Sequence, residues 1–282
     1  MRLTSSEFSA WPNKAITLLG MSGVGKTTLA NKLPKSNWFH YSGDYRIGTK
    51  YLEEPILDNI KQQAMQVDFL RDLLRSDSIY IRSNITVNNL EPLSAFLGKL
   101  GDPTLGGLSL QEFTRRQALH HDAEVGAMRD VVAFIEKART IYQYEHFIND
   151  AGGSVCELDD PTVVELLAEN TLILYIEADD AMETALVERQ RNHPKPLYYQ
   201  SDFLARQLRI YLQGNALADE SAMVPDDFVR WMFPRLIEHR RPRYREIATN
   251  YGYTVSADEV EQVESEQDFL ALVGDTLSRT RP

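Results

Sequence analysis

The amino-acid sequence predicts an α/β fold in which helices cover a mainly parallel sheet. Short apolar runs alternate with segments of helical periodicity along most of the chain, which is the pattern of strand–helix–strand units. The first apolar run, 14–19, leads through a glycine-rich turn directly into a helix-forming run. A short apolar run bounded by turn residues is typical of a buried strand.

The remaining elements follow from the same two patterns. We expect strands at 14–19, 38–41, 147–148, 171–177 and 253–255. We expect helices at 27–33, 55–74, 91–100, 109–144, 162–169, 181–191, 201–213, 226–250 and 265–277. No linker marks a domain boundary, so we expect a single domain over 1–282, with 55–144 as a helical insertion that covers the substrate.

Composition narrows the class of protein. The hydrophobic fraction of 43% is enough for a large core without disulfides, and the single cysteine, Cys156, cannot form an internal one. No apolar stretch approaches the ~20 residues of a membrane span, and residues 1–12 have no apolar core of a secretory signal. We therefore expect a cytoplasmic protein without a membrane contact. A formal net charge of -11 disfavours nucleic acid as a partner, although a local basic cleft would still allow it.

Residues 20–27 match the pattern G-x-x-x-x-G-K-[ST], between an expected strand and an expected helix. Its glycines let backbone N–H groups face phosphate oxygens, and the following helix N-terminus adds partial positive charge. Lys26 would contact the β- and γ-phosphates, and the Thr27 hydroxyl would bind Mg²⁺. The pattern predicts a P-loop NTPase fold, a three-layer sandwich, that binds ATP or GTP. The expected nucleotide contacts are Gly20, Ser22, Gly23, Val24, Gly25, Lys26, Thr27 and Thr28.

A family resemblance extends this interpretation. Residues 20–30, together with Ser42-Gly43-Asp44-Tyr45-Arg46 after the second strand, resemble the small-molecule P-loop kinases. The pattern is nearest to adenylylsulfate kinase and its gluconate- and shikimate-kinase relatives. In adenylylsulfate kinase the second strand ends in Asp-Gly-Asp-x-x-Arg, whereas this chain has one Asp, and Arg46 follows it by two positions. The resemblance implies a kinase superfamily and a role for this position, and it leaves the substrate open.

Asp44 and Arg46 are the candidate acceptor-binding residues. A carboxylate at the carboxyl end of a strand projects into the crevice where α/β proteins bind ligands. There Asp44 would accept the proton of the acceptor hydroxyl or join the Mg²⁺ shell through water. Arg46 would hold an anionic part of the acceptor. The alternatives are a turn aspartate that bonds its own backbone and a solvent-facing arginine.

Asp150 is the second candidate carboxylate. It follows the run 147–149 and precedes Gly152 and Gly153, a position that resembles the Walker B aspartate, which holds Mg²⁺ through water. The sequence alone does not decide which of Asp150 and Asp44 binds Mg²⁺ and which contacts the acceptor, so the two roles could be exchanged. The alternative is an ordinary polar turn.

Arg189 and Arg191 end the helix expected at 181–191. In the kinase superfamily a mobile lid begins at this point, and lid arginines close on the γ-phosphate and neutralise transition-state charge. The alternative is that last-turn arginines stabilise the helix dipole. A second basic cluster, at 240, 241, 243 and 245, would suit phosphate or nucleic acid, but in so acidic a chain we favour an ion-paired, solvated helix face.

Three functions remain open. The leading hypothesis is an ATP- and Mg²⁺-dependent kinase acting on a hydroxyl or phosphate of a small metabolite or nucleotide. The second is a kinase for polynucleotide ends or a modified base in DNA, and the third is an ATP-hydrolysing regulatory module. A GTPase switch is disfavoured because Asn31-Lys32-Leu33-Pro34 lacks the Asp of the guanine-specific Asn-Lys-x-Asp run and lies in the first helix.

Overall fold

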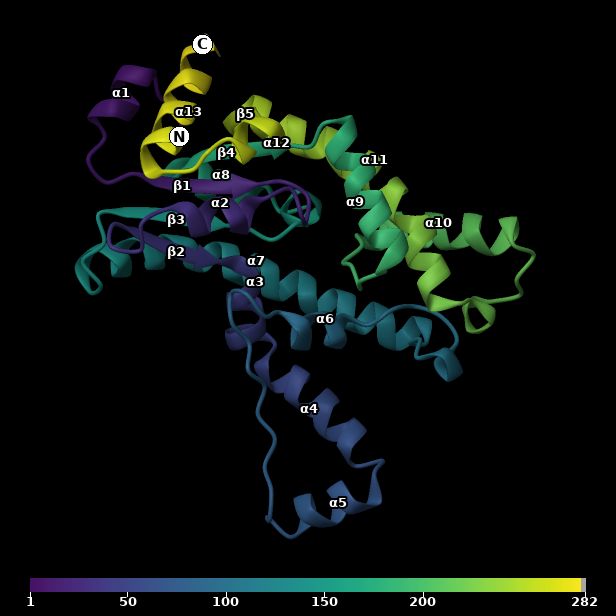
Figure 1. Cartoon of the computed structure of the whole chain (residues 1–282). Coiled ribbons are helices and arrows are strands. Elements are labelled where there is room, and N and C mark those ends of the chain that lie inside the picture. The colour runs from purple at the N-terminus through teal and green to yellow at the C-terminus, as the bar shows by residue number, and fades with distance from the viewer. Residues whose placement is uncertain (280–282) are drawn as a thin grey trace. The chain divides into compact units, whose positions relative to one another are not determined.

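The computed structural model describes residues 1–279, and its centre is a five-stranded sheet. The strands are β1 (Ala15–Leu19), β2 (Trp38–Ser42), β3 (His146–Asp150), β4 (Leu172–Glu177) and β5 (Gly252–Ser256). They lie in the order β2-β3-β1-β4-β5, and every neighbouring pair is parallel (Figure 1). The predicted α/β fold with a parallel sheet is confirmed.

The helices alternate with these strands. They are α1 (Ser5–Ala10), α2 (Lys26–Lys32), α3 (Gly43–Arg46), α4 (Glu53–Ala64), α5 (Asp68–Arg75), α6 (Glu91–Leu97), α7 (Leu110–Thr140), α8 (Pro161–Asn170), α9 (Asp180–Asn192), α10 (Ser201–Gly214), α11 (Pro225–Tyr251), α12 (Ala257–Glu261) and α13 (Glu266–Arg279). The single helix expected over 55–74 is wrong, because Val67 takes extended backbone angles (φ -97°, ψ 112°) and separates α4 from α5.

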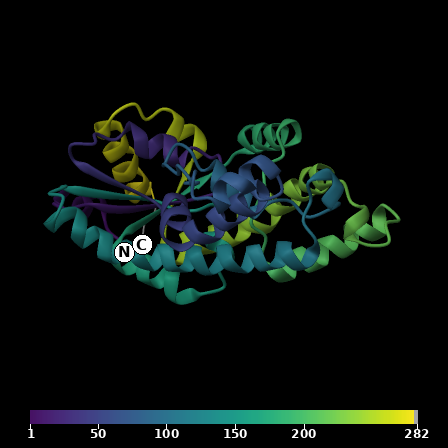
Figure 2. The same ribbon diagram turned by 90° about the horizontal axis from the view of Figure 1, so that it is seen from below.

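Side chains of β2 alternate between two layers of helices. The ring of Trp38 contacts Phe269 of α13, whereas Phe39 and Tyr41 both contact Phe134 of α7. Since successive residues of a strand point to opposite faces, α13 and the second half of α7 cover opposite faces of the sheet. Figure 2 shows yellow α13 and teal α7 on the two sides of the strands. This gives the three layers that the phosphate-loop pattern predicts.

The central strands β1 and β4 are buried on both faces of the sheet, which explains why their sequences are mainly apolar. All five residues of β1 are buried, and so are the first five of β4. The predicted strands at 14–19 and 171–177 therefore match β1 and β4 closely. None of the described helices combines the length and the apolar composition that crossing a bilayer requires.

The chain forms two compact units. The first contains the sheet and is made of Met1–Gly43, Glu124–Pro194 and the described residues from Val229 onward. The second is helical and is made of Asp44–Ala123 and Lys195–Phe228. It contains most of the segment 55–144 and also a segment from much later in the chain. A single domain with an insertion at 55–144 stays a prediction.

Candidate nucleotide site

The phosphate loop follows the central strand. β1 has β3 on one side and β4 on the other, so the loop begins where the sheet order reverses, which is where α/β proteins bind ligands. Gly23 and Gly25 have φ of 92° and 99°, a backbone region that side chains strongly disfavour. These two positions therefore require glycine for the loop to turn into α2.

Lys26 is the first residue of α2 and is 6% exposed. Its Nζ donates to the carbonyl oxygens of Gly20 at 2.7 Å and Met21 at 3.0 Å. The ammonium is thus held against the loop from which it would contact phosphates. This is the placement that the sequence pattern requires.

Thr27 and Asp150 meet beside the loop. The Thr27 Oγ1 donates to Asp150 Oδ2 at 2.5 Å, although the two residues are 123 positions apart. Asp150 ends β3, directly beside β1, where its register partner is Leu18, and it is 5% exposed. A hydroxyl and a carboxylate oxygen are ligands that suit Mg²⁺, which proteins bind through one or two such groups together with substrate phosphates. The donor set therefore fits the predicted metal.

His40 is a neighbour of Asp150 that sequence analysis missed. Its Nε2 lies 3.5 Å from the same Oδ2 that accepts from Thr27. Since Trp38 and His40 are two positions apart on β2, His40 lies on the α13 side of the sheet. No local signal marks it, because a histidine inside a strand is ordinary. No group of three or more His, Cys, Asp or Glu within residues 1–279 is arranged to hold a metal by protein ligands alone.

The loop after β3 packs directly against the phosphate loop. A β-carbon added at Gly153 would lie 2.8 Å from the Ser22 backbone nitrogen and 3.2 Å from its β-carbon. Backbone therefore contacts backbone at this point, and a side chain would force them apart. Gly153 therefore has a steric reason to be glycine, whereas the sequence alone indicates only a turn at this position.

Arg189 lies at the phosphate loop. A β-carbon added at Gly23 would be 3.2 Å from Arg189 Nη1 and 2.8 Å from Leu186 Cδ2, so both α9 side chains contact this glycine. Arg189 is exposed and Leu186 is buried. The backbone oxygen of the exposed Arg191 accepts from Arg230 Nε at 2.8 Å. Of the two predicted lid arginines, Arg189 is the one whose guanidinium the structure places against the loop.

Asp44 and Arg46 lie in α3, which begins as β2 ends. Ser42 is the register partner of Asp150, so Asp44 follows the same edge of the sheet by two positions. Both side chains are half-buried, and both residues belong to the second compact unit. Their roles remain predictions.

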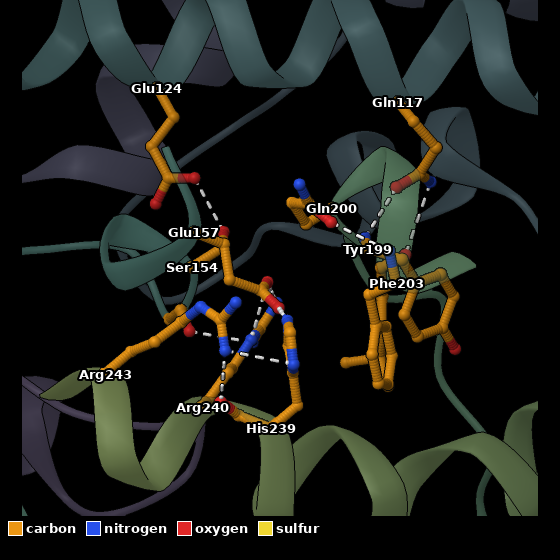
Figure 3. A network of polar contacts seen from close by, with 12 residues as sticks. Gln117, Glu124, Ser154, Glu157, Tyr199, Gln200, Phe203, His239, Arg240 and Arg243 are labelled. Atoms are coloured by element: carbon orange, nitrogen blue, oxygen red, sulfur yellow. Dashed lines mark hydrogen bonds and ion pairs between the residues drawn. The ribbon is translucent and has the colours of Figure 1, made fainter. Parts of the chain in front are cut away.

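A buried polar network joins α7, α11 and the loop after β3 (Figure 3). Ser154 Oγ donates to Glu124 at 2.6 Å. Arg240 donates to Glu157 Oε2 from Nε at 2.8 Å and from Nη2 at 2.6 Å, and to the Gly153 oxygen at 2.7 Å. His239 Nε2 lies 3.3 Å from the other oxygen of Glu157. The network attaches the Gly153 backbone to α11.

Electrostatics stabilise the charge of Arg240 in this network. Burial opposes the charge, but the Glu157 carboxylate and the other groups around Arg240 together raise the pKa of its guanidinium above the usual range. Burial also raises the pKa of the neighbouring Cys156 thiol, which therefore stays protonated at neutral pH. Arg240 is 2% exposed. The predicted ion pairing of this arginine cluster is confirmed for Arg240, Arg241 and Arg245, whereas the predicted solvated placement is wrong for Arg240.

Comparisons with known proteins give similarity in fold only. No family model matches this sequence, and the search of curated proteins gave no match. A shikimate kinase from Bacteroides thetaiotaomicron is 17% identical, with a TM-score of 0.40, over 94% of this chain and 95% of that one. A shikimate kinase from Acinetobacter baumannii, solved with shikimate, is 14% identical, with a TM-score of 0.39, over 92% and 94%.

Proposed function

We propose that this protein is an ATP- and Mg²⁺-dependent kinase that transfers the γ-phosphoryl group to a hydroxyl or phosphate of a small metabolite or nucleotide. The observation that carries the proposal is the convergence of three groups on one loop. These are the Lys26 ammonium, the contact of Thr27 with Asp150, and the Arg189 guanidinium beside Gly23. Lys26 and the Thr27–Asp150 pair would suffice to bind the phosphates with Mg²⁺. The exposed guanidinium of Arg189 adds a group that can neutralise the negative charge on the γ-phosphoryl group during its transfer.

The roles follow from this arrangement. Backbone N–H groups of the loop and Lys26 hold the β- and γ-phosphates in place, while Thr27 and Asp150 hold Mg²⁺. When bound, Mg²⁺ neutralises the charge that develops between the β- and γ-phosphates. Arg189 neutralises charge on the γ-phosphoryl group from the side of α9.

The acceptor is oriented by residues of α3. Asp44 accepts the proton of the attacking hydroxyl, and Arg46 binds an anionic group of the acceptor. The segment 55–144 is our candidate for recognition of the rest of the acceptor. Because ATP, Mg²⁺ and a reduced thiol are characteristic of the cytoplasm, we place the activity there.

The ion pairs of α11 favour a small acceptor over nucleic acid. Arg240, Arg241 and Arg245 contact Glu157, Glu183 and Glu177 respectively. Arginines that already neutralise carboxylates are poorly suited to release phosphate counterions, which is the main source of nucleic-acid affinity. Together with the net charge of -11, this supports the small-molecule alternative over a polynucleotide kinase.

The test is label transfer from γ-labelled ATP with Mg²⁺, with and without a pooled extract of metabolites and nucleosides. We expect a labelled product only when extract is present. Transfer should fall below detection in Lys26→Ala and by about 100-fold or more in Asp44→Asn, because a lost general base typically costs 10²–10⁴ in rate.

The matched control is Asp275→Asn on α13, an exposed carboxylate outside the segment 55–144, which should leave transfer unchanged. Release of ADP and free phosphate at a rate that does not depend on extract would overturn the kinase proposal. It would instead favour the ATP-hydrolysing regulatory module.

A further inference from the structure

We propose that Arg241 is a positioning residue that acts through Glu183 to hold α9, and with it Arg189, against the phosphate loop. The inference rests on the proposed function, because it assigns a role to the arginine that would neutralise the γ-phosphoryl group. It uses residues of the first compact unit only.

The first step is that α11 holds α9 near both ends. Near the start of α9, Glu183 accepts from Arg241 through both carboxylate oxygens, one of them at 2.9 Å from Nε. At the other end, the Arg191 oxygen accepts from Arg230 Nε at 2.8 Å. Arg230 and Arg241 are about three helical turns apart and therefore lie on one face of α11.

The second step is that the part of α9 between these attachments contacts the phosphate loop. Leu186 and Arg189 lie between Glu183 and Arg191, and both contact Gly23. A bidentate arginine–carboxylate pair fixes orientation as well as distance. The position of Arg189 over the loop therefore depends on where Arg241 holds Glu183.

The third step is that α11 is also attached to a second segment that contacts the loop. Arg240, the neighbour of Arg241, is bound to Glu157 and to the Gly153 oxygen, and Gly153 contacts Ser22. Glu157 is fully buried, so this attachment lies away from solvent. Two consecutive arginines thus link α11 to two segments that contact neighbouring residues of the phosphate loop.

The ion pair between Arg241 and Glu183 should contribute little to the stability of the protein. Its side chains are 33% and 19% exposed, and partly exposed ion pairs contribute little to the stability of the folded state. Loss of Arg241 should therefore affect the placement of α9 far more than the unfolding temperature. That difference separates a positioning role from a structural one.

The experiment measures hydrogen exchange and catalysis on Arg241→Ala, Arg241→Lys and Glu183→Gln. We expect the α9 amides of Arg241→Ala to exchange at least about tenfold faster, with the sheet amides unchanged, because local opening frees one helix only. Transfer of phosphate from ATP, or its hydrolysis if no acceptor is known, should lose about 10–100-fold in kcat with KM for ATP within twofold. Arg241→Lys should recover only part of this, because lysine supplies charge without the bidentate fork.

Two further variants make the test specific. Exchange of the charges in Glu183→Arg/Arg241→Glu should restore kcat to within about fivefold of wild type, since the pair is re-formed. Arg129→Ala removes another arginine–carboxylate pair between helices of the same unit, with Asp160, and should change neither measurement.

The outcomes separate the two proposals. Unchanged exchange in α9 of Arg241→Ala overturns the positioning role, whether or not the protein is a kinase. Faster exchange throughout the sheet, with a large fall in unfolding temperature, also overturns it in favour of a structural role. Local loosening of α9 in a protein whose wild type transfers no phosphate overturns the kinase and leaves the positioning role in place.

Discussion

Gly153 shows at the residue scale how tightly the site is built. Its backbone lies so close to Ser22 that an added β-carbon would be 2.8 Å from the Ser22 nitrogen. Gly214, at the end of α10, has nothing within 4 Å of the same position. The two glycines therefore form a natural pair for testing whether the loop after β3 supports the phosphate loop.

We predict that Gly153→Ala weakens the binding of ATP by about tenfold or more. The added methyl group must displace the Ser22 backbone, which would move an N–H donor of the phosphate loop by tenths of an ångström. Titration with a fluorescent ATP analogue measures this, and Gly214→Ala is the control. An affinity within twofold of wild type in Gly153→Ala would show that Ser22 does not need this support.

At the scale of elements, short polar motifs mark where helices begin. Ser109 Oγ accepts from the Glu112 backbone N–H at 3.4 Å, and Ser265 Oγ accepts from Asp268 N–H at 3.2 Å. Both spacings are visible in the sequence, because each contact lies within one helical turn. The break at Val67 has no such signal, since helical periodicity continues through it.

The capping box of α12 should make a measurable contribution to the free energy of unfolding. Ser256 Oγ accepts from Glu259 N–H at 3.2 Å, and the Glu259 carboxylate accepts from Ser256 N–H at 3.0 Å. We predict that Ser256→Ala lowers the free energy of unfolding by about 1 kcal/mol and the Tm by roughly 2–4 °C. Thermal unfolding followed by circular dichroism measures the shift. Ser278→Ala, late in α13 and exposed, should stay within about 0.5 kcal/mol, and equal shifts in the two variants would refute the capping effect.

At the scale of the whole molecule, nucleotide binding should stabilise the native protein. A ligand that binds only the folded state adds about 2.7 kcal/mol at a concentration 100 times its Kd. We predict that ATP with Mg²⁺ raises the Tm of the wild type. Lys26→Ala should abolish the increase, because it removes the ammonium that we propose to hold the phosphates. Scanning calorimetry with and without ATP makes the measurement.

The control for this prediction is Lys61→Ala on α4, whose side chain is 49% exposed. It should keep the full increase in Tm. A wild-type protein whose Tm does not respond to ATP and Mg²⁺ would contradict nucleotide binding itself, and with it every role assigned to the phosphate loop.

The sequence by itself determined the features that depend on neighbouring residues. The phosphate loop, the strands on either side of it and the position of Asp150 at a strand end all rest on patterns a few residues long. Hydrophobic periodicity and glycine placement determine local structure, so they can be recognised in the sequence without knowledge of the tertiary structure. They predicted the fold class and most elements of the sheet.

Only the tertiary structure decided which distant residues meet. The contact of Thr27 with Asp150 joins residues 123 positions apart, and Arg189 rather than Arg191 presents its guanidinium to the loop. The arginines of α11, which read as one basic face, divide among Glu157, Glu183 and Glu177 on three different segments. Such pairings depend on how the helices pack on the sheet. A short sequence motif does not specify this packing, so it cannot predict which distant residues become partners.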